Sequence, residues 1–357
     1  MKSLALAAGS AVLPTARAAP SRTRVVAVNV ARERVQRTLV GLRPYRPSGH
    51  VVRAEKLGNK LLVHNYGHGG AGVTLSWGTA MLAADLVQKR PQSVAVLGAG
   101  AVGLATARVL QDRGNKVTIY ARDRSPHTTS DIAGARWYPF DVFDKKTVSP
   151  QFLSSLWSAS RVSYGMFGRL DPVRYGTYRY PTFCCRNTPF PTDTLLDFQS
   201  PVHDLLPGLR DLSADEKPFD YPFVRTFETL MIEPAIYLPA VTQDFERAGG
   251  TFVQRDFATR GEVDALVEST IVNCTGLGAA TLFGDGDLYP IKGQLTILSP
   301  QPEVKYVTLP PDGYMFPRHD GIVLGGTFQH HVATLEPDLV AEEKVMAMHA
   351  RFFRTLR

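Results

Sequence analysis

The chain has 357 residues, of which 44% are hydrophobic, so it can bury a full core and is long enough for two interleaved domains. Lys and Arg outnumber Asp and Glu by 40 to 33, which gives a formal net charge of +7 at pH 7. The basic residues are scattered in runs of no more than two, which argues against nucleic-acid binding but favours an anionic substrate or cofactor. The three cysteines, Cys184, Cys185 and Cys274, form neither a disulfide framework nor a metal-ligand spacing, so no metal site is predicted.

The first 20 residues have the pattern of an export signal. Lys2 precedes a small apolar run that reaches Leu13, and Ala16-Arg-Ala18 fits an A-x-A cleavage site. The run is too short to span a membrane, and a disordered extension is the alternative. No twin arginines precede it, although a protein that folds around its cofactor before export would need them. We expect a periplasmic or secreted protein if the signal functions and a cytoplasmic one otherwise.

A glycine-rich loop lies in the first quarter of the chain. Gly67, Gly69, Gly70 and Gly72 fall within six positions and open a helix predicted to run to about Val87. Because the N–H groups at a helix N-terminus bind anions, the loop predicts an anion site, with a flexible linker as the alternative. The buried-type strand before it and the amphipathic pattern after it favour the site.

Two arginines lie between prolines ahead of this loop, in the segment 41–49. The prolines stiffen the backbone that carries Arg43 and Arg46. A rigidly held guanidinium is suited to bidentate capture of a carboxylate, although a surface position is the alternative for either arginine.

A second glycine loop has the spacing of a dinucleotide site. A short apolar run meets Gly-x-Gly-x-x-Gly at Gly98, Gly100 and Gly103, and apolar residues then repeat at helical spacing. The next predicted strand, 116–120, ends just before Asp123, where an acid can hold a ribose hydroxyl. The pattern predicts a dinucleotide whose pyrophosphate meets the helix N-terminus, and it leaves NAD and FAD open.

The remaining segments are predicted from composition and periodicity. Residues 141–225 are rich in proline and aromatic residues, show little periodicity and are expected to form a separate lobe with loops. The stretch 228–249 contains a predicted helix. Further strands are predicted at 251–255, 270–276, 290–298, 313–317 and 321–328, the last three antiparallel, and a final helix from about Leu339 to the terminus.

Several of these stretches, taken together, resemble the D-amino acid oxidase family. In that family's order they are Gly98–Gly103, Thr128–Asp131, Val272–Gly276, Lys292–Gln294, Tyr314–Pro317 and Gly325–Gln329. Gly41–Pro44 and His64–Gly72 also resemble it, but the family carries them near its C-terminus. The resemblance covers nearly everything after residue 35, so the chain resembles a circular permutant joined at residues 89–93, with a mis-assembled gene as the alternative.

The resemblance implies an α/β architecture. We expect a Rossmann-like FAD-binding domain interleaved with an α+β substrate domain that contains a mostly antiparallel sheet. The predicted FAD-binding domain takes residues 21–140 and 226–283, of which 21–90 match the family's C-terminal part. The predicted substrate domain takes 141–225 and 284–340, and a C-terminal helix takes 341–357.

The resemblance also implies FAD as cofactor and oxidative deamination by hydride transfer from the substrate Cα to flavin N5, with hydrogen peroxide as a product. Arg43 would hold the substrate carboxylate, Tyr314 would add a hydrogen bond, and Gly70 would complete the catalytic set. Matches to the family's cofactor contacts are Gly98, Gly100, Ala101, Val102, Gly103, Asp123, Thr128, Thr129, Gly134, Ala135, Arg255, Phe257, Gly69, Gly70, Gly72, Val73 and Thr74.

Departures from the family leave the substrate open. One family tyrosine ahead of the Tyr314 strand has no clear match near Tyr306 or Pro310, and Phe140 stands where some members carry tyrosine. The alternatives are a related flavin amine oxidase acting on glycine, N-methylated or acidic amino acids, and a non-catalytic FAD-binding protein. The expected partners are an amino acid and molecular oxygen, without nucleic acid or membrane, and a homodimer stays open.

Overall fold

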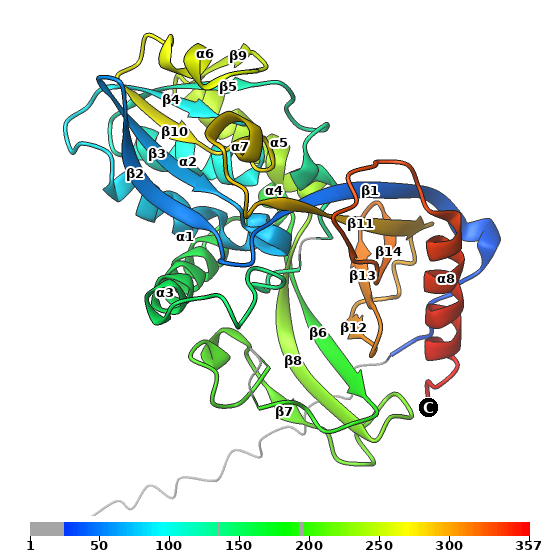
Figure 1. The fold of residues 1–357 in the computed structure, drawn as a ribbon. Helices are drawn as coiled ribbons and strands as arrows, with labels where there is room; N and C mark the ends of the chain where they lie inside the picture. Colours follow the sequence, from blue (N-terminus) through cyan, green and yellow to red (C-terminus); the bar gives the residue numbers. More distant parts are fainter. Residues whose placement is uncertain (1–24, 135, 193–195) are drawn as a thin grey trace, which may run out of the picture.

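The computed structural model describes residues 25–134, 136–192 and 196–357, which form two β-sheets with helices packed against them (Figure 1). The predicted export signal at residues 1–20 and the predicted cofactor contact Ala135 lie outside the described residues.

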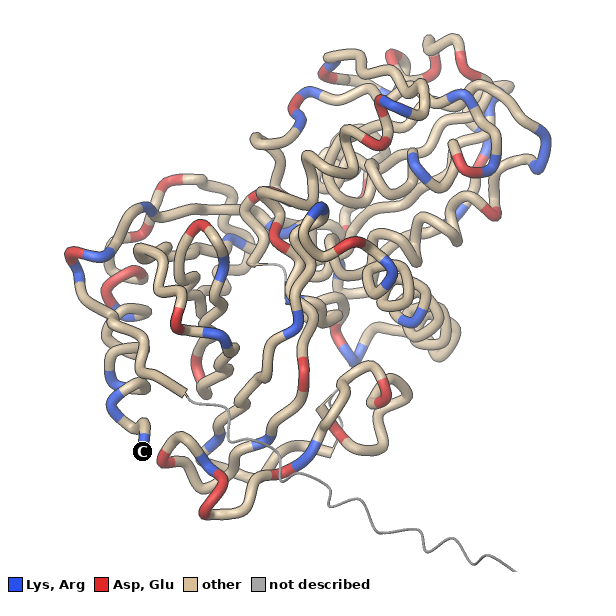
Figure 2. The backbone as a smooth tube through the Cα atoms, turned by 180° about the vertical axis from the view of Figure 1, so that it is seen from behind, with Lys and Arg blue, Asp and Glu red and all other residues tan. Residues whose placement is uncertain are grey.

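Basic and acidic residues are interspersed along the backbone, as the scattered charge in the sequence predicts (Figure 2).

The smaller sheet has the strand order β2-β3-β10-β4-β5-β9. Its strands are β2 (Val51–Leu57), β3 (Lys60–Tyr66), β10 (Thr270–Asn273), β4 (Ser93–Leu97), β5 (Lys116–Ala121) and β9 (Thr251–Gln254). Neighbouring strands are parallel except for the β2–β3 hairpin. Residues 94–97 of β4 are completely buried because side chains from helices cover both faces of the sheet, which explains their unbroken apolar run.

Helices α1 (Gly72–Asp85), α2 (Ala101–Asp112) and α5 (Pro234–Arg247) pack on one face of this sheet, and α6 (Arg260–Asp264) and α7 (Gly278–Phe283) contribute to the other. Helix α1 also packs closely against α3 (Pro150–Phe167), where a Cβ on Gly78 would meet the Ala159 carbonyl oxygen at 2.0 Å. Most of α1 is therefore buried, and the amphipathic helix expected here is wrong.

The larger sheet has the order β1-β11-β14-β13-β12-β6-β8-β7, with β15 also paired to β11. Its strands are β1 (Val35–Tyr45), β11 (Tyr289–Leu298), β14 (Gly321–Gly325), β13 (Tyr314–Arg318), β12 (Val307–Leu309), β6 (Thr177–Arg186), β8 (Phe223–Ile232), β7 (Arg210–Asp211) and β15 (Gln329–His330). All pairs are antiparallel except β12–β6. The antiparallel arrangement predicted for 290–298, 313–317 and 321–328 is confirmed, with β14 between β11 and β13.

Residues 141–225 contain more regular structure than the sequence suggests, and the separate lobe with loops expected there stays a prediction. They contain α3, α4 (Pro172–Tyr175), and a long β6–β8 pair whose second strand continues to Ile232. Ser149 caps the start of α3 by accepting a hydrogen bond from the Phe152 N–H, with Pro150 at the first helical position. Packing against α1 then buries one side of α3, including Ala159 and Ser163.

Segments assigned to one predicted domain contribute to both sheets. Strand β1 (Val35–Tyr45) and residues 226–232 of β8 belong to the larger sheet, although both fall within the predicted FAD-binding domain. The domain boundaries themselves stay a prediction.

The first and last described segments lie side by side. Val28 packs in the same buried cluster as Phe352 of α8 (Leu339–Phe353), which lies beside β11 and β14. Between α1 and β4 runs a short link, residues 86–92. None of the helices in the described ranges has the length and apolar character needed to cross a bilayer.

Candidate active site

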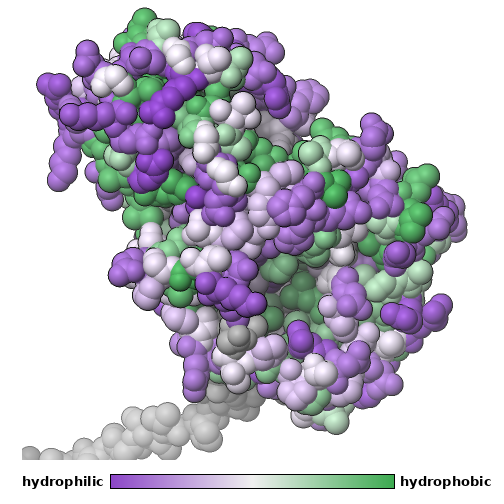
Figure 3. Space-filling model, in the orientation of Figure 1, coloured by the Kyte–Doolittle hydropathy of each residue, from purple (hydrophilic) through white to green (hydrophobic). Residues whose placement is uncertain are grey.

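One cavity of about 1370 Å³ lies where the two sheets meet. It exceeds the roughly 300–1,000 Å³ typical of sites for drug-sized ligands. Both glycine loops line it, together with Arg43 and Tyr314, and so does every other described residue that the sequence predicts for the site. Figure 3 shows an apolar hollow over the larger sheet on one face of the molecule. The convergence of two loops that are far apart in sequence, which the site prediction needs, is therefore present.

The loop after β4 has the geometry that its three glycines predict. Gly98 has φ +104°, and a Cβ there would meet the Cys274 carbonyl oxygen at 2.5 Å. A Cβ on Gly103 would lie 2.0 Å from the Gly98 carbonyl oxygen, so the glycine lets α2 pack directly on the strand end. Gly100, the residue before α2, has no side chain with which to cap the helix, so the N–H groups of Val102 and Gly103, two residues that line the cavity, are left for a ligand.

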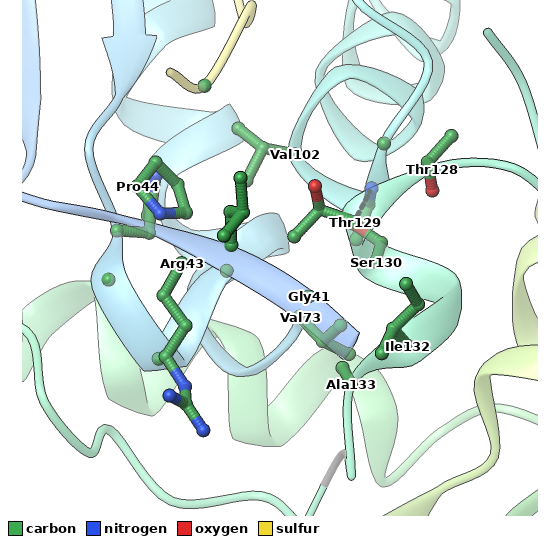
Figure 4. Close-up of a pocket in the computed structure, with 18 of the residues that line it drawn as sticks. Gly41, Arg43, Pro44, Val73, Val102, Thr128, Thr129, Ser130, Ile132 and Ala133 are labelled. Atoms are coloured by element: carbon green, nitrogen blue, oxygen red, sulfur yellow. Dashed lines mark hydrogen bonds between the residues drawn. The ribbon is translucent and has the colours of Figure 1, made fainter. Parts of the chain in front are cut away.

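A short turn next to the start of α2 forms part of the cavity wall. Residues 129–132 form a 3-10 helix closed by a capping box, in which Asp131 accepts hydrogen bonds from the Thr128 N–H and hydroxyl at 2.8 and 2.6 Å. Within this turn, the Ser130 hydroxyl accepts a hydrogen bond from the Ala101 N–H at 2.9 Å. Figure 4 shows this turn beside Val102 at the start of α2. The capping box therefore fixes a hydroxyl at the helix N-terminus, a role that the sequence prediction missed.

The predicted ribose ligand lies at the end of β5. Asp123 lines the cavity and accepts a hydrogen bond from Arg122 Nε at 2.7 Å. Hydrogen bonding to this carboxylate raises the pKa of Arg122. On the neighbouring segment, Arg255 and Phe257 also line the cavity, with the guanidinium 4.7 Å from the ring centroid.

The second glycine loop leads into α1, whose first three residues line the same cavity. Gly69 has φ +56°, and a Cβ there would meet the Asp141 carbonyl oxygen at 2.0 Å. The Gly70 N–H donates to that same carbonyl at 3.1 Å, so this N–H is not free for a ligand. Any contribution of Gly70 to catalysis thus falls to its carbonyl. Helix α1 begins at Gly72 without a side-chain cap, so its first N–H groups are the donors available to a ligand.

A buried histidine pair supports the second loop. His50 and His68 stack with ring centroids 5.1 Å apart, and His68 Nε2 lies 3.0 Å from the Thr79 hydroxyl oxygen. Burial lowers the pKa of His50 to about 4 and that of His68 well below its ordinary value. Both rings are therefore neutral at pH 7, and their role here is structural.

The structure separates the two candidate arginines. Arg46 Nε lies 2.8 Å from Asp285 Oδ2, and its Nη2 lies 3.5 Å from Asp287 Oδ2, so its charge is compensated. Arg43 extends from β1 into the cavity (Figure 4), where its Nη1 donates a hydrogen bond to the Thr327 carbonyl at 3.4 Å. No carboxylate of the described residues forms an ion pair with Arg43, which leaves it able to bind one on a ligand.

Aromatic rings enclose the Arg43 guanidinium. Its carbon lies 4.7 Å from the centroid of Phe328, which packs against Phe140 at 5.5 Å. The Tyr314 hydroxyl interacts with Arg43, and burial raises the pKa of this phenol although the guanidinium opposes the shift. Tyr314 is thus a protonated donor at neutral pH. Tyr306, in contrast, is buried with its hydroxyl bonded to the Val26 carbonyl and does not line the cavity.

The comparisons with known proteins identify the family of the chain. The family model described as "FAD dependent oxidoreductase" matches residues 11–86 and 93–356. The gap between the two matches falls at the α1–β4 link, where the permuted chain is predicted to be joined; the permuted order itself stays a prediction. The chain is 30% identical to a D-amino-acid oxidase of Streptomyces coelicolor over 262 residues, which cover 71% of this chain and 75% of the relative.

Other relatives extend the comparison. A D-amino-acid oxidase of Dictyostelium discoideum is 29% identical, covering 70% of each chain, and the human D-aspartate oxidase is 26% identical, covering 71% of this chain and 74% of the relative. The structure of a glycine oxidase from Bacillus cereus aligns with a TM-score of 0.56 and 17% identity, covering 71% of this chain and 78% of that one, and shows the likeness of fold.

The cavity fits FAD on its own geometry. Neither α1 nor α2 is capped by the side chain of its own N-cap residue, and glycines whose Cβ would clash with backbone line both loops, so main chain can approach a dinucleotide closely at each. The described residues contain no group of three metal-ligating side chains. The motif resemblance and the predicted α/β, Rossmann-like fold are thereby confirmed: the chain is an FAD-dependent oxidase of the FAD-dependent oxidoreductase family to which these D-amino acid oxidases belong.

Proposed function

We propose that this protein catalyses the oxidative deamination of D-amino acids. The single observation that supports it most is the unpaired Arg43 guanidinium, held in the same cavity as both glycine loops. A planar guanidinium binds a carboxylate bidentately, so the site suits a molecule with a free carboxylate. The names of the relatives point to the D series and to amino acids as substrates.

Arg43 and Tyr314 orient the substrate in this proposal. The guanidinium takes the two carboxylate oxygens, and the protonated phenol donates to one of them. Gly293 makes this placement possible, because a Cβ there would meet the Arg43 nitrogens at 2.5 Å. A charged contact from Arg43 and a neutral hydrogen bond from Tyr314 at one end of the substrate fix the direction of its Cα–H bond, which converts binding energy into orientation.

The aromatic pair keeps water from the carboxylate clamp. Phe328 covers the guanidinium, and Phe140 packs on Phe328 at the edge of the cavity. Excluding water strengthens the interaction of Arg43 with the carboxylate. Both rings are partly exposed, so they lie at the mouth of the site and can separate to admit the substrate.

FAD, when bound, supplies the two-electron acceptor, so that an amino acid, oxygen and water yield a 2-oxo acid, ammonia and hydrogen peroxide. The uncapped start of α1 provides N–H groups and a positive helix end that stabilise negative charge on a ligand beside them. Residues 72–74 are the ones that would face such charge. No general base is needed if the amine is bound in its neutral form.

The test is Arg43→Ala in the purified holoenzyme, with a peroxide-coupled screen of D- and L-amino acids. We expect D-amino acid oxidation to be lost while the yellow cofactor stays bound, because Arg43 contacts substrate. Arg169→Leu, an exposed arginine outside the cavity, is the matched control and should keep full activity. Wild-type activity of Arg43→Ala would remove this arginine from the site. A wild-type chain that binds FAD but is not bleached by anaerobic D-alanine or any other D-amino acid would instead be a non-catalytic FAD-binding protein.

A further inference from the structure

A second arginine lies in the cavity without a charged partner. Arg136 lines the cavity, and its Nη1 is buried with no hydrogen-bond partner. Its guanidinium carbon lies 4.3 Å from the centroid of Tyr138, and its backbone pairs with Met231 of β8. Burial of the guanidinium lowers its pKa, so holding this charge here is costly in the absence of an anion.

Arg186 adds positive charge beside Arg136. It ends strand β6, lines the same cavity, and has a buried Nε without a hydrogen-bond partner. The buried Cys184 thiol links the two arginines: burial raises its pKa to about 11, while Arg136, Arg186 and Arg225 all oppose that shift. Of these three, Arg225 is compensated by Asp211, at 2.6 Å from its Nε.

The acidic residues around the cavity do not neutralise these two arginines. Three aspartates line it: Asp123 is bonded to Arg122, Asp256 lies next to Arg255, and Asp312 neighbours the Tyr314 strand. No ion pair joins any carboxylate of the described ranges to Arg136 or Arg186. The end of the cavity near β6 and β8 is therefore electropositive, and it can accept an anion from a ligand.

This electropositive end belongs to the same cavity as the carboxylate clamp, because Arg43 and Arg136 both line it. Gly134, two residues before Arg136, lies beside the Tyr314 ring, which a Cβ on Gly134 would meet at 3.8 Å. The Tyr314 hydroxyl in turn interacts with Arg43. A ligand whose first carboxylate is held by Arg43 and Tyr314 therefore shares its cavity with a second guanidinium that forms no ion pair within the described residues.

We propose that the preferred substrates carry an acidic side chain, with Arg136 as the residue that selects it and Arg186 as its support. The inference rests on the proposed oxidation of amino acids and adds the class of side chain. The side-chain carboxylate of aspartate or glutamate would pair with the Arg136 guanidinium. An amide of the same shape would leave that charge unpaired, so the site discriminates by charge rather than size.

The test compares D-aspartate and D-glutamate with D-asparagine and D-glutamine in the holoenzyme. We expect kcat/KM to favour the acids by about tenfold or more, and Arg136→Leu to lower kcat/KM for the acids by about ten- to a hundredfold, the range for a lost hydrogen bond to a charged group. The amides should change less than about threefold. Arg136→Lys should restore part of the preference, and Arg169→Leu should leave it intact.

A binding measurement without turnover separates the two proposals. Succinate and its monoamide are titrated against the holoenzyme by the change in flavin absorbance, and Arg136→Leu should weaken only succinate. Oxidation of neutral D-amino acids without preference for the acids would overturn this inference and leave the proposed function standing. Arg136-dependent succinate binding in a protein that oxidises no D-amino acid would support the anion subsite and refute the function. Loss of FAD from Arg136→Leu would place Arg136 on the cofactor and overturn the inference.

Discussion

Replacing Gly103 by alanine tests the packing on which the cofactor site depends. A Cβ at this position would lie 2.0 Å from the carbonyl oxygen of Gly98 and 2.9 Å from its carbonyl carbon. Ordinary contact begins near 3.4 Å, so α2 must move away from the strand end by about 1.4 Å, the difference between 3.4 and 2.0 Å. Both clashing atoms belong to the backbone, so no side chain can rotate to relieve the contact.

The change in the free energy of unfolding on replacing Gly103 by alanine is the difference between two opposing effects. Overpacking of this kind destabilises by about 1–3 kcal/mol, and alanine in a helix recovers about 1 kcal/mol relative to glycine. We therefore expect Gly103→Ala to lower the free energy of unfolding by up to about 2 kcal/mol. The displaced N-terminus of α2 should also weaken FAD binding by about tenfold or more, since its N–H groups no longer meet the phosphates at hydrogen-bond distance.

The assay is urea unfolding of the holoenzyme at a fixed FAD concentration, together with FAD retention after dialysis. Gly165→Ala is the matched control, because Gly165 lies within α3 and a Cβ there would meet nothing within 4 Å. It should stabilise the protein by about 0.5–1 kcal/mol and leave FAD binding unchanged. A Gly103→Ala protein with wild-type stability and wild-type FAD affinity would refute the contact between α2 and the Gly98 carbonyl.

Three further predictions concern other parts of the site. Burial lowers the pKa of both His50 and His349 from 6.5 to about 4, so the unfolded chain binds more protons between these values. Unfolding free energy should therefore fall as pH drops from 6.5 towards 4, by about 1.4 kcal/mol per pH unit for each histidine, and a flat urea midpoint over this range would contradict it. Asp131→Ala breaks the capping box beside α2 and should weaken FAD binding about two- to thirtyfold, which flavin fluorescence would measure; unchanged affinity would exclude the turn from the phosphate site. Phe328→Ala uncovers Arg43 and should raise KM about two- to fivefold with little change in kcat, and an unaltered KM would show that the ring does not support the clamp.

The local elements of the site could be predicted because each depends on a short stretch of chain. The spacing of Gly98, Gly100 and Gly103 reports a turn and a helix start, and the structure has both. The loop at Gly69 was found in the same way. Long-range contacts carry no such signal, so the compensation of Arg46 by Asp285, the fixed Gly70 N–H and the position of Tyr306 away from the cavity appeared only in the folded chain.

The regular structure within 141–225 was missed for a related reason. Helix α3 is stabilised by close packing on α1, and the β6–β8 pair by its neighbours in the larger sheet, so neither segment needs a strong pattern of its own. The role proposed for Arg136 likewise depends on contacts that form only in the folded chain. The resemblance assigns its neighbours Gly134 and Ala135 to the cofactor, but only the folded chain, in which Arg136 pairs with β8, shows that its charge is unpaired.

The sequence by itself determined the dinucleotide loop, the family resemblance and Arg43 as a candidate ligand, because glycine spacing and proline-flanked arginine restrict the backbone locally. Only the tertiary structure decided that the two loops share one cavity, that Arg43 rather than Arg46 keeps a free guanidinium, and that Arg136 lines the same cavity. The physical reason is that charge compensation and cavity shape depend on segments hundreds of residues apart, and the chain brings these together only when both sheets form.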